Sequence, residues 1–275
     1  MRLGLLSDVH ANLPALQTAL RSLEARGVDR ILVAGDLVGY GGQPNECVEA
    51  LRDVGADCVS GNHDLFVLDR LPAKRFPPLA RRSAELTRLL LSADVRDYLS
   101  SLPERLQVEN VVMTHGSLYD VEEYVSTRSR AAELLSRLPT EAPGATTLVL
   151  GHTHRQLCVV AGGGRLPVSG TTPLPGGLRL INPGSVGQSR QRERRPRARC
   201  AIYDVTAQQV EFQALDYDVE ASVEVLRHLG LPDRCLHAPP RLRWRVARLA
   251  RAAGRAATSA QQRHASSGEN QPPIG

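Results

Sequence analysis

The first 65 residues carry the pattern that decides the fold, and they open with MRLGLLSDVH, residues 1–10. The apolar run over residues 2–6 reads as a strand, and polar residues follow as soon as it ends. Helical and apolar patterns then alternate along the chain, over residues 13–26, 30–34, 44–52 and 57–60. This alternation predicts a β-α-β-α-β unit with parallel strands.

The remaining sequence predicts one large domain, residues 1–240, that contains a helical insertion. Residues 66–105 have a helical pattern interrupted by prolines, which we interpret as a cap or lid over the sheet. Strand patterns return after this insertion, and the later ones are typical of hairpins in a mixed sheet. They cover residues 106–114, 146–150, 178–181, 201–205 and 210–215.

Composition narrows the class of protein without naming a chemistry. With 275 residues, of which 42% are hydrophobic, the chain can bury a full-sized core. The first apolar run is too short for a signal peptide and no 18-residue apolar stretch follows, so we expect a cytoplasmic protein. Its five cysteines are scattered and form no CxxC pair, which favours reduced thiols over disulfides or a thiolate metal site.

The basic net charge of +5 belongs to the C-terminal tail. Residues 241–275 hold seven Arg and one Glu, a net of +6, which leaves about −1 for residues 1–240. Arginines at three- and four-residue steps over residues 241–255 predict a short basic amphipathic helix. A solvated face is the simpler interpretation, and contact with nucleic acid is the alternative. The composition from Ala257 onward is typical of disorder.

Polar residues stand directly after five of the apolar runs, and they include five of the eight histidines. Side chains at the carboxyl ends of neighbouring strands converge on one crevice in an open α/β sheet. We therefore expect these segments to bring their polar residues into one small volume. The residues are Asp8 and His10, Asp36, Asn62 with His63 and Asp64, His115, and His152 with His154.

Two carboxylates, one carboxamide and several imidazoles suit a pair of borderline divalent cations such as Mn, Zn, Fe or Ni. Asp36 stands alone after the second strand, with Gly35 permitting close backbone approach, and is the natural bridge between two ions. The spacing of Asp8 and His10 is expected to place both side chains on one face of an extended segment. His152 and His154 share this spacing, so that a turn between them lets the segment supply each ion.

Two ions roughly 3.5 to 4 Å apart suit in-line displacement at phosphorus, because they position the substrate and activate water. The remaining requirement is an acid for the leaving group. We assign this role to His63, and we expect the neighbouring Asp64 to hydrogen-bond its second ring nitrogen and to stabilise the imidazolium.

The motifs DVH, GDLVGYG, GNHD, THG and GHTH, in this order over residues 1–218, resemble the calcineurin-like metallophosphoesterases. SDVHANLPAL, GDLVGYGGQPNE and INPGSVGQ are most similar to the small bacterial and archaeal phosphodiesterases of that superfamily. The resemblance implies an α/β (α+β) four-layer sandwich, in which two mixed β-sheets are flanked by helices and the metal site lies at strand carboxyl ends. It also implies two ligand sets that share Asp36. One ion would be held by Asp8, His10, Asp36 and His154, and the other by Asp36, Asn62, His115 and His152.

Two departures from relatives bear on the substrate. Protein serine/threonine phosphatases carry an Asp-Arg pair where this chain has Gly39 and Tyr40, and losing that cation favours a diester over a dianionic monoester. The loop over residues 189–199 holds six Arg and one Glu. Arg190 and Arg197 fall where relatives carry Arg, and we expect both to bind substrate. The surplus charge either attracts polyanions, such as dinucleoside polyphosphates or nucleic acid, or belongs to a hydrated loop.

The sequence thus predicts a cytoplasmic phosphodiesterase with two divalent ions, Mn²⁺ being the first choice and Fe, Zn or Ni the alternatives. Its substrate would be a small phosphate ester or a nucleotide. A dinucleoside polyphosphate hydrolase and a phosphomonoesterase of the same fold are the enzymatic alternatives. The non-enzymatic alternative is an inert scaffold that binds proteins, similar to the retromer subunit of this fold. Retention of every metal ligand together with His63 favours the enzyme.

Overall fold

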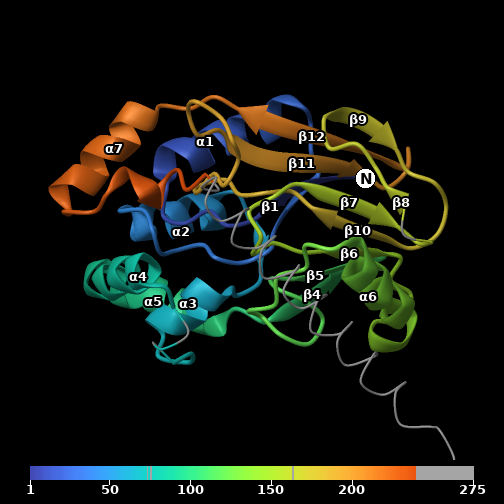
Figure 1. Cartoon of the computed structure of the whole chain (residues 1–275), viewed down its shortest axis with the longest axis horizontal. Helices are drawn as coiled ribbons and strands as arrows, with labels where there is room; N and C mark the ends of the chain where they lie inside the picture. Colours follow the sequence, from blue (N-terminus) through green and yellow to red (C-terminus); the bar gives the residue numbers. More distant parts are fainter. Residues whose placement is uncertain (73, 75, 163, 240–275) are drawn as a thin grey trace, which may run out of the picture. The chain divides into compact units, whose positions relative to one another are not determined.

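The computed structural model describes residues 1–239 except 73, 75 and 163, and its strands form two mixed sheets of six strands each (Figure 1). The first sheet has the order β3 (Asp57–Cys58), β2 (Arg30–Val33), β1 (Arg2–Leu6), β11 (Ala198–Asp204), β12 (Gln209–Leu215), β9 (Gly170–Pro173). The second has the order β4 (Arg105–Val108), β5 (Val111–Thr114), β6 (Thr147–Val149), β10 (Arg179–Asn182), β7 (Leu157–Val160), β8 (Gly164–Arg165). In each sheet a run of three parallel strands is extended by antiparallel ones, namely β1 to β3 and β5, β6 and β10.

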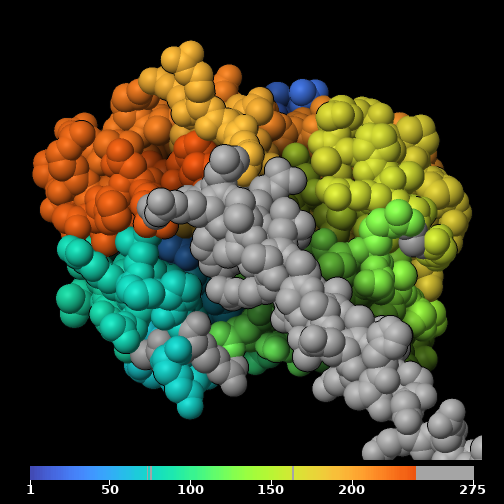
Figure 2. Space-filling model, in the orientation of Figure 1, coloured from blue at the N-terminus to red at the C-terminus, as the bar shows by residue number. Residues whose placement is uncertain are grey.

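The described residues form seven α-helices (Figure 1). Their bounds are α1 (Leu13–Ala25), α2 (Pro44–Asp53), α3 (Asn62–Val67), α4 (Pro78–Leu90), α5 (Ala93–Ser101), α6 (Arg128–Glu141) and α7 (Val219–His228), with a short 3-10 helix at Asp233–Cys235. All except α6 contribute to the core on the outer face of the first sheet, and α6 packs on the second sheet. In the space-filling view, the surface formed by α7 and that formed by β8 and β9 lie on opposite sides of the molecule (Figure 2). No helix within the described ranges is long and apolar enough to cross a membrane.

Three clusters of buried apolar side chains divide the fold into layers. The first lies between β1, β2 and β11 and their covering helices, and includes Leu16 of α1 and Leu226 of α7. The second lies between the two sheets, where Leu5 and Leu32 belong to the same cluster as Met113. The third lies between the second sheet and α6. Helix, sheet, sheet and helix thus follow one another, which confirms the predicted fold class.

The predicted elements of the first 65 residues are all present, with ends shifted by one or two residues. Asn12 caps α1 by accepting a hydrogen bond from the backbone N–H of Ala15, as Asn commonly does at this position. The strand expected over residues 106–114 was wrong. It is two antiparallel strands, β4 and β5, joined by a turn in which Glu109 has a φ of 50°.

The helical insertion expected over residues 66–105 contains α4 and α5. Ala84 of α4 and Leu99 of α5 are buried in the same core as α1 and α2, so these helices are part of the helical layer. A cap role for them stays a prediction. Helices α6 and α7 were not predicted, and the tail over residues 241–275 lies outside the described residues.

Candidate metal centre

The loops that follow four strands meet at one edge of the two sheets. Leu6 of β1 is paired with Val33 of β2 in the first sheet, and Met113 of β5 with Val149 of β6 in the second. Asp8 and Asp36 follow the first pair by two and three residues, and His115 and His152 follow the second pair in the same way. Backbone hydrogen bonds join the two loops of each sheet. In the first sheet Asp8 N donates to Gly35 O (3.0 Å), and in the second Gly151 N donates to His115 O (2.8 Å). Strand register therefore brings the predicted ligands together.

Five of the seven predicted ligands have a left-handed backbone, which costs about 1–3 kcal/mol for each non-glycine residue. They are Asp8 (φ 53°), His10 (50°), Asp36 (55°), His152 (62°) and His154 (57°). The expectation that Asp8 and His10 lie on an extended segment was therefore wrong. Their side chains converge because the chain turns at both residues. This concentration of strained backbone indicates that the positions are maintained for the site.

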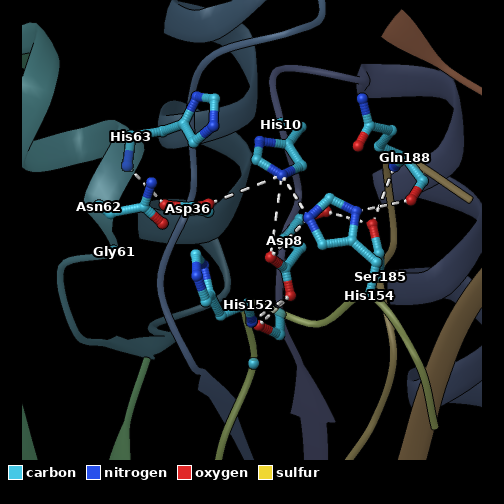
Figure 3. A network of polar contacts seen from close by, with 12 residues as sticks. Asp8, His10, Asp36, Gly61, Asn62, His63, His152, His154, Ser185 and Gln188 are labelled. Carbon is cyan, nitrogen blue, oxygen red and sulfur yellow. Dashed lines mark hydrogen bonds and ion pairs between the residues drawn. The ribbon is translucent and has the colours of Figure 1, made fainter. Parts of the chain in front are cut away.

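One group of ligand atoms, cluster A, consists of Asp8, His10 and His154, all buried (Figure 3). His154 Nε2 lies 3.1 Å from Asp8 Oδ1 and 3.2 Å from His10 Nε2. His10 Nε2 lies 3.8 Å from the same carboxylate oxygen. Three potential ligand atoms thus face a common point between them.

The protons of cluster A are directed away from that point. Burial lowers the pKa of His10 and of His154, so both rings are neutral and each carries a single N–H. The Nδ1 atoms lie 3.2 Å from Val38 O and 2.8 Å from Gln188 O, and because a carbonyl only accepts, each Nδ1 donates. The two Nε2 atoms therefore face each other as lone pairs, an arrangement that a shared cation relieves.

The two carboxylate oxygens of Asp8 in cluster A differ in their hydrogen bonding. Its Oδ2 accepts hydrogen bonds from the Ser7 hydroxyl (2.7 Å) and from His152 N (3.1 Å). Its Oδ1 is buried and has no hydrogen-bond partner among the described residues. A buried carboxylate oxygen without a donor is costly unless a cation binds it.

Cluster B consists of Asn62, His115 and His152. His115 Nε2 lies 3.1 Å from Asn62 Oδ1 and 3.2 Å from His152 Nδ1. The outer ring nitrogens again face carbonyls, with His115 Nδ1 2.7 Å from Ala34 O and His152 Nε2 3.0 Å from Glu122 O. Burial alone would lower the pKa of His115, but the charge and hydrogen bonding of Asp36, with smaller effects of Asp8 and the Ala34 carbonyl, together outweigh it and raise the pKa to about 9. The His115 ring thus holds a proton where a bound cation would supply positive charge.

Asp36 lies between the clusters. Its Oδ1 accepts a hydrogen bond from His63 N (2.8 Å), and its Oδ2 lies 3.7 Å from His10 Nε2 and 3.3 Å from His115 Nε2. The preceding Gly35 has a φ of 78°, and a Cβ there would come within 2.8 Å of His115 Nδ1. This close approach is the reason for glycine at that position.

His63 lies beside Asp36 with its ring enclosed by aromatic groups. Ring centroids of Tyr40 and Phe76 are 4.7 and 5.1 Å from that of His63. Its Nδ1 is buried without a hydrogen-bond partner in the described ranges, and a Cβ at Gly39 would lie only 2.3 Å from it. Burial lowers the pKa of His63 to about 4. His63 also forms a third group of potential ligand atoms with His10 and Asp36.

Asp64 does not hydrogen-bond the His63 ring, so that expectation was wrong. Its carboxylate accepts the backbone N–H groups of Leu37 (3.2 Å), Val38 (3.1 Å) and Gly61 (2.8 Å). Burial raises the pKa of Asp64 to about 7 against the opposing effect of these donors. Asp64 thus ties together the loops that carry Asp36 and Asn62.

The two predicted substrate-binding arginines have different surroundings. Arg190 donates to Gln188 Oε1 (3.1 Å) and to the Tyr124 hydroxyl (3.1 Å), both uncharged acceptors. Gln188 also accepts from His154 through its carbonyl, and the Tyr124 ring lies over His152, so Arg190 shares a neighbour with each cluster. Arg197 instead donates to Glu193 Oε2 (3.1 Å), so its charge is already paired.

The sequence did not indicate three further groups of this centre. These are the carbonyls of Glu122 and Gln188, which accept from His152 and His154, and the ring of Tyr124, whose centroid lies 4.1 Å from that of His152. A backbone carbonyl has no sequence signal. Tyr124 does not follow a strand-like run, so a search for polar residues after such runs does not find it.

The residues present fit metal ions. Two carboxylates each have one oxygen filled by protein donors and the other directed into the centre, and four imidazoles direct their outer N–H toward carbonyls. Such outer hydrogen bonds are the usual support of metal-binding histidines. A buried set of carboxylate, amide and imidazole groups at the edge of a two-sheet α/β fold defines a metal-dependent hydrolase.

Comparison with known proteins identifies the family. The chain belongs to the calcineurin-like phosphoesterase superfamily, whose domain profile matches residues 1–208. It is therefore a metallophosphoesterase, a hydrolase of phosphoric esters, as the sequence predicted. The inert scaffold is set aside.

Similar proteins come from bacteria and archaea. A metallophosphoesterase from Sphaerobacter thermophilus is 34% identical, with a TM-score of 0.72 over 86% of this chain and 97% of that one. Protein PH1004 from Pyrococcus horikoshii OT3 shares the fold at 19% identity, with a TM-score of 0.70 over 86% and 96% of the two chains. Protein MJ0912 from Methanocaldococcus jannaschii is 29% identical over 243 residues, which are 84% of this chain and 94% of that protein.

Proposed function

We propose that this metallophosphoesterase is a phosphodiesterase that works with two divalent ions, one in each cluster and both bound by Asp36. The observation that carries the proposal is the pair of imidazole contacts, His10 with His154 and His115 with His152, each 3.2 Å between ring nitrogens on either side of one carboxylate. Mn²⁺ is our first choice, and Fe, Zn and Ni suit the same ligands. When bound, the ions would supply activated water and the positive charge that in-line displacement at phosphorus needs.

The protein's own residues account for the other requirements of hydrolysis. Arg190, whose acceptors are uncharged, binds a non-bridging phosphate oxygen by a charge-assisted hydrogen bond. His63 donates a proton to the leaving oxygen. Its low pKa leaves the ring neutral at pH 7, so the bound phosphate anion must raise that pKa for the ring to take up the proton.

Asp64 and Arg197 serve the same reaction less directly. Asp64 positions His63 because its carboxylate binds the backbone of Gly61, just before His63 in the chain, and that of Val38 in the neighbouring loop. Arg197 orders the loop of Arg190 through its ion pair with Glu193, and it reaches substrate only if that pair opens.

The preference for a diester rests on Gly39 and Tyr40. Gly39 packs against His63 Nδ1 and Tyr40 against the His63 and His10 rings, so these positions offer aromatic and backbone surface and no charge. A dianionic monoester would have to be neutralised without a cation there. The centre also accommodates the chemistry of a phosphomonoesterase or of a dinucleoside polyphosphate hydrolase. We infer a cytoplasmic location from the five buried free cysteines.

Parallel assays of bis-p-nitrophenyl phosphate and p-nitrophenyl phosphate with added Mn²⁺ test the proposal. We expect the wild type to hydrolyse the diester faster than the monoester, and His63→Gln and Asp36→Asn to hydrolyse both slowly. A wild type no faster than either variant contradicts the enzymatic mechanism. A wild type that prefers the monoester contradicts the diester assignment alone.

A further inference from the structure

Tyr124 presents an aromatic ring at the border of cluster B. Its ring lies over the imidazole of His152, with 4.1 Å between centroids and 50° between planes. Its hydroxyl accepts a hydrogen bond from Arg190 Nη1 at 3.1 Å. The ring therefore spans the short distance between a candidate metal ligand and the candidate phosphate-binding cation.

The loop that carries Tyr124 is fixed on both sides of the residue. The Glu122 carbonyl accepts the Nε2 proton of His152 at 3.0 Å. Glu123 is bound by the Arg130 guanidinium through two hydrogen bonds, of 2.6 and 2.9 Å. The loop is thus held in place before substrate arrives, which reduces the ordering cost of binding a group on the ring that it carries.

Exposure distinguishes Tyr124 from the other rings of the centre. Tyr124 is 54% exposed, whereas Tyr40 and Phe76 are 7% and 8% exposed. Exposure alone is common for tyrosine, but this exposed ring lies between His152 and Arg190. It therefore offers free aromatic surface at the border of the centre, and covering such a ring is favourable.

We propose that Tyr124 is a stacking platform for a planar aromatic group of the substrate, and that the natural substrate is therefore a nucleotide-type ester. The inference rests on the proposed function, because it places the phosphate between Arg190 and the metal centre. An ester substituent that extends from the phosphate toward Arg190 would lie next to the Tyr124 ring, because Arg190 is hydrogen-bonded to the Tyr124 hydroxyl. A nucleobase suits such a ring because stacking requires a flat face and no particular hydrogen-bonding edge.

Equilibrium binding tests the platform without turnover. The Mn²⁺-loaded full chain carrying His63→Gln is titrated calorimetrically with AMP and with ribose 5-phosphate, which differ only in the base. Because stacking on an aromatic side chain strengthens the binding of a base, we expect AMP to bind about tenfold more tightly. Adding Tyr124→Ala should bring the two dissociation constants within about twofold of each other.

Tyr124→Phe is the matched control, because it keeps the ring and removes the hydroxyl that Arg190 contacts. It should preserve the ratio between AMP and ribose 5-phosphate even if it weakens both. Equal binding of the two ligands before Tyr124 is changed overturns the platform. Equal weakening of both ligands by Tyr124→Ala also overturns it, because that result indicates a purely structural role.

Hydrolysis separates failure of this inference from failure of the proposed function. Thymidine 5′-(p-nitrophenyl phosphate) and ethyl p-nitrophenyl phosphate share a leaving group and differ in the second ester group, which is a nucleoside in the first and an ethyl group in the second. Relative to Tyr124→Phe, which also lacks the hydroxyl, Tyr124→Ala should raise KM about tenfold for the first ester and change it by less than about twofold for the second. If the wild type hydrolyses both with equal KM, the platform is wrong and the phosphodiesterase stands. If it hydrolyses neither, the proposed function is wrong.

Discussion

Clusters A and B are built alike and differ in charge and in access. In both, each imidazole directs its outer nitrogen toward a backbone carbonyl and its inner nitrogen toward other ligands of the centre. One imidazole of each cluster, His10 or His115, also lies near the shared Asp36. Cluster A adds a second carboxylate, Asp8, where cluster B adds the neutral amide of Asn62. The ligands of cluster A are at most 1% exposed, while Asn62 and His152 of cluster B are 6% and 5% exposed.

This difference predicts that the two clusters bind their ions with different affinities. An ion in cluster A would face two carboxylates and be sealed from solvent, whereas an ion in cluster B would face one carboxylate. Ligand charge is a main determinant of affinity for divalent cations, so cluster A should hold its ion more tightly. Cluster B borders Tyr124 through His152, so the proposed stacking platform would place the substrate on this half of the centre.

Replacing Asp36 should have the largest effect, because both clusters lose their shared carboxylate. Asp36→Asn leaves each cluster without its common carboxylate. We expect activity to fall by more than about 100-fold, since even loss of an outer hydrogen-bond partner of a metal ligand costs about 10- to 100-fold. Steady-state rates at saturating Mn²⁺ provide the measurement. Full activity in Asp36→Asn would mean that the clusters act separately.

Adding a carboxylate to cluster B should narrow the difference between the clusters. In the wild type we expect graded chelation to remove one ion at a lower chelator concentration than the other. Asn62→Asp gives cluster B a second carboxylate and should raise the affinity of the weaker ion by about tenfold. Metal analysis after dialysis against a chelator series measures both ions. Two ions leaving together in the wild type would contradict the assigned difference.

Two glutamates support the clusters from a distance and make a matched pair. Glu193 binds Arg199 (2.7 Å) in the loop whose Gln188 carbonyl accepts from His154, and Glu123 binds Arg130 beside the Glu122 carbonyl. Glu193→Gln should weaken the tighter ion and Glu123→Gln the weaker one. We expect less than about a tenfold loss in each case, because neither residue touches a ligand. The same effect of both variants on one ion would break the assignment.

The acid stability of Glu193→Gln is the smallest expected effect. Burial alone raises the pKa of Glu193, but hydrogen bonds from Arg199 and Ser189 outweigh it and lower the pKa to about 2. The stabilisation is therefore present above the ordinary value of about 4.5 and is lost as pH falls toward 2. The urea midpoint of unfolding should decrease less between pH 7 and pH 3 in the variant than in the wild type. An equal fall in both proteins would contradict the role of Glu193.

The sequence indicated the residues that meet in both clusters because each follows an apolar run, and strand register places them together. That they bind metal stays a prediction. The sequence could not give the left-handed backbone at Asp8 and His10, which depends on contacts between loops of different strands. It misplaced Asp64 because adjacency to His63 along the chain suggested a contact with the His63 ring, whereas the carboxylate accepts from the backbone N–H groups of Leu37, Val38 and Gly61. The turn at Glu109 was missed because it lacks the Gly or Pro that usually indicates a turn.

Anomalous diffraction at the manganese absorption edge, from crystals of the wild-type chain grown with Mn²⁺, tests the central claim most directly. The account predicts two peaks within reach of Asp36, one contacting Asp8, His10 and His154 and the other Asn62, His115 and His152. A single peak, or two peaks of which one does not contact Asp36, would contradict it.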